Sequence, residues 1–74
     1  MLDMIEKTVF EVTGKKGLTP QTDFVKDLAL NSFDIMNIIS AFEDKFDIVI
    51  PVRDVWQMRK VEDVLLYFEK KGLS

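Results

Sequence analysis

The sequence predicts an all-α fold: a small four-helix bundle with three longer helices, one short third helix and a long loop between the first two helices. In three stretches, apolar residues recur every three or four positions, as they do along one face of an α-helix. The two prolines and three glycines all lie outside these stretches. The apolar run at 48–50 is too short for a strand and has no evident partner, so it predicts an extended loop that inserts into the core.

The first helix is expected over about three turns, from residue 2 to about residue 12. Its apolar stripe consists of Leu2, Ile5, Val9 and Val12. Phe10 is expected to widen this stripe, and Gly14 to cap the C-terminus of the helix.

Residues 15–31 predict the long loop. Gly17 and Pro20 break regular structure within it. Residues 24–28 are expected to form one short helical turn. Five apolar residues are expected to hold the loop against the core: Leu18, Phe24, Val25, Leu28 and Leu30. A loop of this length in a compact domain usually has a function.

The second helix is predicted from Ser32 to Phe46. Its apolar stripe consists of Ile35, Ile38, Ile39, Phe42 and Phe46. Asn31 is a favourable N-cap, and Asp34 follows it at the spacing of a capping box. Ser32 then occupies the first helical position with its hydroxyl toward solvent, where an attached phosphate would be favoured. A serine is also common at helix starts without any further role.

The outward face of this helix is a candidate partner-binding surface. With the residues on either side of Ser32 included, the candidate partner-binding residues here are Asn31, Phe33, Asp34, Met36, Asn37, Ser40, Glu43 and Asp44. Between 31 and 47 four acidic residues stand against Lys45 alone. The pattern fits an acidic docking strip beside Ser32, and the flexible Met36 suits a surface that meets several partners. It also fits a solvated helix face.

A third and a fourth helix are also predicted, and both are shorter than the second. Pro51 is expected at the first position of a helix that extends to about Met58. The last helix is expected from about Val61 to Lys71 and is ended by Gly72. Lys60 has no side-chain acceptor to cap it, so a frayed start is expected.

Composition excludes several functions. With 74 residues the chain is expected to form one domain, 1–74, and it has no cysteine or histidine, which removes disulfides, Cys or His zinc sites and the usual catalytic base. We therefore expect neither an enzyme nor a metal site. A net charge of −3 disfavours nucleic acid and anionic membranes and favours a basic protein partner. No signal peptide or membrane span is evident, so a cytoplasmic monomer is expected.

Residues 24–68 resemble an acyl carrier protein, or the related peptidyl and D-alanyl carrier proteins. The similarity lies in three ordered blocks at the family's spacing: Phe24, Val25, Lys26, Asp27, Leu28; Asn31, Ser32, Phe33, Asp34; and Phe42, Glu43, Asp44, Lys45, Phe46, Asp47, Ile48 before Ile50 and Pro51. The resemblance implies that a phosphopantetheinyl transferase attaches a 4'-phosphopantetheine arm from coenzyme A to Ser32. Acyl or aminoacyl groups would then travel as thioesters on the arm to acyl-loading, synthase or transferase enzymes with basic docking surfaces.

The chain departs from the common family pattern beside the serine. Asn31 and Phe33 replace the usual Asp and Leu, and Ala29 replaces a Gly of fatty-acid carriers. The resemblance also implies an acyl cavity between the helices, with the expected lining Phe33, Ile38, Phe42, Ile50, Val55, Met58 and Val64. Phe33, Phe42 and Val64 are larger than the commonest family residues, which leaves less room in a close-packed interior and predicts a short or polar cargo.

Two further questions stay open in the sequence. Trp56 fits either a partner contact or core packing, and it contributes to some similarity with D-alanyl carriers. Fatty-acid, polyketide, nonribosomal-peptide and cell-envelope pathways all use such carriers. The alternative function is an unmodified helical interaction module that binds a basic partner through the acidic second helix.

Overall fold

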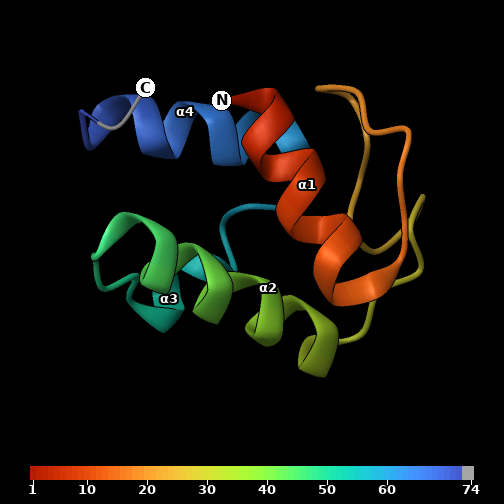
Figure 1. The fold of residues 1–74 in the computed structure, drawn as a ribbon, viewed down its shortest axis with the longest axis horizontal. Coiled ribbons are helices and arrows are strands. Elements are labelled where there is room, and N and C mark those ends of the chain that lie inside the picture. Colours follow the sequence, from red (N-terminus) through yellow and green to blue (C-terminus); the bar gives the residue numbers. More distant parts are fainter. Residues whose placement is uncertain (73–74) are drawn as a thin grey trace.

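The computed structural model describes residues 1–72; Leu73 and Ser74, the last two positions of the expected domain, lie outside the described residues. Within that range the chain forms four helices, α1 (Leu2–Thr13), α2 (Ser32–Phe46), α3 (Val52–Val55) and α4 (Val61–Lys70), and no strand. Figure 1 shows α1 beginning beside α4 and running diagonally toward α2, and it contacts both of these helices; the long loop runs along one side of the bundle. The predicted all-α fold is confirmed.

The core is apolar and draws on all four helices, on the long loop between α1 and α2 and on the loop between α2 and α3. Its buried residues are Ile5, Val9, Leu18, Phe24, Leu30, Ile38, Ile39, Phe42, Ile50, Val55, Val61, Val64 and Phe68. Phe42 of α2 meets Phe68 of α4 edge to face, with ring centroids 5.2 Å apart. This geometry is the favourable one for two aromatic quadrupoles.

Helix α1 ends as its sequence predicts, at Gly14, whose φ of 77° is left-handed and whose N–H donates to the Phe10 carbonyl over 2.8 Å. Phe10, however, does not widen the buried face, since half of its surface is exposed. It follows Val9 by one residue and is therefore rotated about 100° from it around the helix axis, away from the core.

The long loop is held in place by hydrogen bonds as well as by its apolar residues. The N–H of Leu18 donates to the Glu6 carboxylate of α1 over 3.1 Å. Asp23 pairs with Lys60 in an isolated antiparallel bridge, which ties the loop to the start of α4. Residues 24–28 form the predicted turn, and the Asp23 carboxylate caps it by accepting from the N–H groups of Val25 and Lys26, each over 2.8 Å.

Helix α3 is shorter than predicted. Pro51 is its N-cap rather than its first residue, with an extended ψ of 144°. The helix ends at Val55, because the N–H groups of Gln57 and Met58 donate to carbonyls three residues back and so form turns tighter than an α-helix. The Tyr67 hydroxyl of α4 donates to Asp54 over 2.9 Å, and burial together with this carboxylate raises the pKa of Tyr67 to about 12.

Helix α4 has an N-terminal cap, so the predicted frayed start is wrong. The carboxylate of Asp63 accepts hydrogen bonds from the backbone N–H groups of Arg59 and Lys60, each over 3.0 Å. Lys60 lacks an acceptor, but the acid three residues later reaches back and supplies half of a capping box. The helix ends at Lys70, one residue before the predicted end, and Gly72 follows with a φ of 76°.

Candidate functional site

The start of α2 holds Ser32 in a defined and exposed position. The Asn31 side chain accepts from the Asp34 N–H over 2.9 Å, and the Asp34 carboxylate faces the Asn31 N–H at 3.5 Å, which together form the expected capping box. Ser32 is the first residue of the helix and is exposed. The cap fixes the backbone around the serine and leaves its side chain accessible to another protein.

The outward stripe of α2 begins one residue after the serine. It consists of Phe33, Asn37, Ser40 and Asp44, all exposed. These positions are spaced by four, three and four residues, so they lie on one face of the helix. Phe33 is 72% exposed, and its predicted place in the acyl cavity is wrong, because the helical period that carries Ile35 and Ile38 inward carries Phe33 outward.

Three other predicted partner residues are less open than expected. The Glu43 carboxylate accepts from the Ile50 N–H over 2.8 Å and holds the 48–50 loop against α2. Asp34 is half-buried in the capping box, and Met36 is half-buried against the core. Of the three acids of α2, Asp44 alone is exposed, whereas Asp34 and Glu43 are half-buried and engaged in hydrogen bonds within the chain.

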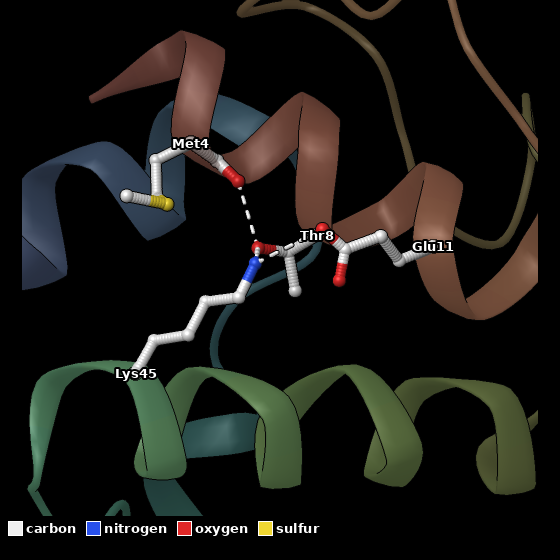
Figure 2. Close-up of polar contacts among 4 residues, drawn as sticks. All are labelled: Met4, Thr8, Glu11 and Lys45. Carbon is white, nitrogen blue, oxygen red and sulfur yellow. Dashed lines mark hydrogen bonds and ion pairs between the residues drawn. The ribbon is translucent and has the colours of Figure 1, made fainter.

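Lys45 does not lie on this outward stripe. Figure 2 shows its side chain reaching from α2 to α1, where Nζ donates to the buried Thr8 hydroxyl over 2.8 Å and approaches Glu11 at 3.5 Å. Thr8 in turn donates to the Met4 carbonyl over 2.8 Å. The cation of α2 is thus drawn toward α1, away from the outward stripe of α2.

An interior cavity lies between α2, α3 and α4, with a volume of about 20 Å³. Five of the predicted lining residues surround it: Ile38, Phe42, Val55, Met58 and Val64. Ile50 is buried but lies outside this lining. Sequence reasoning missed Phe24, Ile35 and Ile39, although the first was expected in the core and the other two belong to the apolar stripe of α2.

Trp56 lies at the surface just after α3 and is 51% exposed. Together with Val25 and Arg59 it borders a surface groove of about 200 Å³. About half of the Trp56 side chain is thus packed against the protein, and the partner contact at Trp56 stays a prediction.

Comparison with known proteins places this geometry in a family. The sequence profile of the phosphopantetheine attachment site matches residues 5–68. The chain belongs to the acyl carrier protein family. Members of this family are carriers rather than enzymes, and the group they carry is phosphopantetheine.

Individual acyl carrier proteins resemble the chain over most of its length. That of Bdellovibrio bacteriovorus is 40% identical over 52 residues, which cover 70% of this chain and 67% of that protein. One from Helicobacter pylori is 40% identical over 57 residues, covering 77% and 73%. A solved structure described as an acyl carrier protein of Mycobacterium tuberculosis superposes with a TM-score of 0.82 at 30% identity, covering 88% and 89%.

No helix within 1–72 is both long and apolar enough to cross a membrane. The same residues contain no cluster of three or more acidic, histidine or cysteine side chains placed to hold a metal ion.

Proposed function

We propose that the Ser32 hydroxyl carries the 4'-phosphopantetheine arm of this acyl carrier protein. The supporting observation is the position of Ser32: an exposed side chain on the first residue of α2, beside a rigid capping box. The residues fit the group, because the phosphodiester would lie at a helix N-terminus, where N–H groups and the helix dipole favour an anion.

The attachment reaction belongs to a separate transferase. The Ser32 oxygen attacks the phosphorus that joins pantetheine to the nucleotide in coenzyme A; a new oxygen–phosphorus bond forms, the diphosphate bond breaks and adenosine 3',5'-bisphosphate leaves. The proton of the hydroxyl passes to a base of the transferase, since this chain has no histidine to accept it. When bound, the arm supplies the thiol on which acyl or aminoacyl groups ride as thioesters.

Partner enzymes would recognise the outward stripe of α2. Phe33 offers an exposed aromatic anchor next to Ser32, and Asp44 an exposed anion about three turns further along α2. Asn31, Asn37 and Ser40 contribute polar contacts, and Trp56 adds a second aromatic surface. An apolar anchor with an acidic neighbour fits transferase, acyl-loading and synthase enzymes that have basic docking surfaces.

The carrier is further proposed to serve a specialised pathway with a short or polar cargo. Its cavity of about 20 Å³ is only slightly larger than the volume that one water molecule needs. This volume is far smaller than a long acyl chain requires. Polyketide, nonribosomal-peptide and cell-envelope pathways all remain candidates beside fatty-acid synthesis. We propose one carrier domain over 1–74 that acts as a cytoplasmic monomer.

The experiment is intact-mass measurement after incubation with coenzyme A and several broad-specificity phosphopantetheinyl transferases. A mass gain of one arm that Ser32→Ala abolishes and Ser40→Ala retains supports the proposal; Ser40 is the matched control because it is an exposed serine of the same helix. No gain with any transferase contradicts it and favours an unmodified interaction module that binds a basic partner through α2.

A further inference from the structure

Three exposed cations gather around one polar groove on the surface of this acidic chain. The groove has a volume of about 290 Å³ and lies between the loop before α2 and the segment that leads into α4. Lys26, Arg59 and Lys60 line it, and all three are exposed. We call these three residues the cation surface. Their charge is opposite in sign to the net charge of the whole protein, which is −3.

The acidic residues of the same groove lie deeper than the cations. Asp23 is buried, and Glu62 and Asp63 are half-buried. The carboxylates of Asp23 and Asp63 each accept two backbone N–H groups, over 2.8 Å and 3.0 Å respectively. The pKa of Asp23 is lowered first by the Lys26 N–H and further by the charges of Arg59 and Lys26, which places both cations near this carboxylate. A protein that approaches the groove therefore meets the cations before the acids.

Backbone hydrogen bonds fix the two segments that carry the cations. The Phe24 N–H donates to the Arg59 carbonyl over 3.0 Å, and the Val61 N–H donates to the Thr22 carbonyl over 2.9 Å. These two bonds flank the isolated bridge that joins the loop to the start of α4. Because the backbone of the cation surface is already ordered, a partner that binds there orders only side chains, which lowers the entropic cost of binding.

The chemistry of the groove favours a protein surface over a small anion. The first three N–H groups of α4 all donate to carbonyls within the chain, at 2.9–3.0 Å, so they are not available to a phosphate. Only side chains from two separate segments could then hold the anion. Carboxylates spread along the surface of another protein can meet such cations one by one, so an acidic protein surface fits best.

The cation surface lies near the residue proposed to carry the arm. Arg59 also lines the neighbouring groove of about 200 Å³, which Ile35 of α2 lines as well. Ile35 follows Ser32 by three positions, which is about 4.5 Å along the helix axis. An enzyme that reaches Ser32 can therefore contact the cation surface with the same face. The outward stripe of α2 offers that enzyme one exposed acid, Asp44, so the cations add a contact of opposite sign.

We propose that the cation surface docks an acidic surface of the enzymes that act on the arm. Such an enzyme would place basic side chains opposite Asp44 and acidic side chains opposite Lys26, Arg59 and Lys60. Two contacts of opposite sign fix the orientation of the carrier, because a rotated pose brings like charges together. The identity of the partner rests on the attachment of the arm to Ser32, whereas the binding of carboxylates rests on the cation surface itself.

The test uses an alternating Glu–Gly peptide as the acidic surface and the full, unmodified chain as its partner. The peptide is titrated into the protein while the backbone amide resonances are recorded. We expect saturable shifts centred on Lys26, Arg59 and Lys60 at about 0.01 M salt, and weaker binding at about 0.15 M, where charges are screened beyond about 8 Å. An alternating Lys–Gly peptide should leave these three amides unshifted. No shift with the Glu–Gly peptide, or shifts spread evenly over the chain, would overturn the proposal.

Two triple variants of equal net charge separate the position of the cations from their number. The first combines Lys26→Gln, Arg59→Gln and Lys60→Gln, and should weaken peptide binding by about threefold or more, the effect of three exposed ion pairs. The control removes three exposed lysines elsewhere and should bind like the wild-type protein; it combines Lys7→Gln, Lys15→Gln and Lys16→Gln. Both variants are checked for an unchanged unfolding midpoint. An equal loss of binding in the two variants would refute the cation surface.

Two further outcomes are distinguishable. If inorganic phosphate binds the same three residues more tightly than the peptide does, the groove is a site for a small anion and the docking proposal is wrong. If the peptide binds as expected but no transferase adds mass to the protein, the attachment at Ser32 fails. In that case the cation surface is retained and only its assignment to arm-handling enzymes is refuted.

Discussion

Lys45 of α2 donates a hydrogen bond from Nζ to the Thr8 hydroxyl of α1 over 2.8 Å, across 37 positions of sequence. Thr8 is fully buried, and its own hydroxyl proton goes to the Met4 carbonyl. The bond therefore gives a buried oxygen a charged donor and joins the two helices near the C-terminal end of α2 (Figure 2). It also directs the Lys45 cation toward α1 and away from the exposed Asp44.

This pair is expected to be coupled in stability. Thr8→Val should lower the free energy of unfolding by about 1–2 kcal/mol, since Lys45 loses its acceptor and Met4 its donor. Lys45→Met should cost about 1 kcal/mol, and the double variant less than the sum, with a coupling of about 0.5–1.5 kcal/mol in urea unfolding. Lys7→Met, an exposed lysine of α1, is the control; strictly additive losses would contradict the prediction.

Ala29 has a φ of 55°, in the left-handed region that disfavours a side chain. Ala29→Gly should therefore raise the free energy of unfolding by about 0.5–1 kcal/mol, because relief of strain exceeds the added chain entropy of glycine. The same change at Ala41, inside α2, should lower it by about 1 kcal/mol. Chemical denaturation of both variants checks the opposite signs, and destabilisation by Ala29→Gly would disprove the strain.

Asp63 is expected to stabilise α4 through its cap. Asp63→Ala removes the acceptor of two backbone N–H groups and should cost about 1–2 kcal/mol. The control is Glu62→Ala, which removes an acid from the same first turn. Amide hydrogen exchange should show faster exchange at Arg59 and Lys60 in the Asp63 variant alone; equal protection in both variants would argue against the cap.

The folded protein is expected to lose stability in acid because of Asp23. Its pKa lies below the usual 3.8, chiefly because the carboxylate accepts the Lys26 N–H, with burial acting in the opposite direction. A depressed pKa in the folded state gives stability that is present above pH 3.8 and is lost as the pH falls through the folded pKa. Asp23→Asn should flatten this loss in unfolding measured at successive pH values below 3.8, whereas Asp3→Asn should retain it. An unchanged slope in Asp23→Asn would count against the assignment.

The residue at position 31 is expected to affect how efficiently a transferase attaches the arm. The carriers this chain resembles usually have an acid at that position, and Asn31→Asp adds a charge while keeping the cap. With a transferase that has a basic docking surface, kcat/KM should rise about two- to fivefold, as one exposed ion pair contributes about 0.5–1 kcal/mol. Asn31→Ser, which caps without a charge, is the control and should leave kcat/KM near the wild-type value; an equal rise in both would show that charge is irrelevant.

The helices were predictable to within a few residues because each carries its own signals. The apolar stripe of α2 and the capping pair Asn31 and Asp34 both lie within one short stretch, and both were found as expected. The bounds of α3 were predicted wrongly, because they depend on hydrogen bonds among several neighbouring residues. Pro51 could begin α3 or cap it, and the tight turns after Val55 that shortened the helix have no marker in the sequence.

The sequence by itself determined the all-α fold, the central buried stripe of the three longer helices, and the exposed serine at the start of α2. Those properties follow from the helical period and local hydrogen bonds, which need only nearby residues. Only the tertiary structure decided that Lys45 bonds Thr8, that Glu43 holds Ile50 and that Arg59 borders a groove beside Trp56. These relationships depend on how the segments pack, because a side chain's partner across the bundle is set by the position of another element and not by its own periodicity.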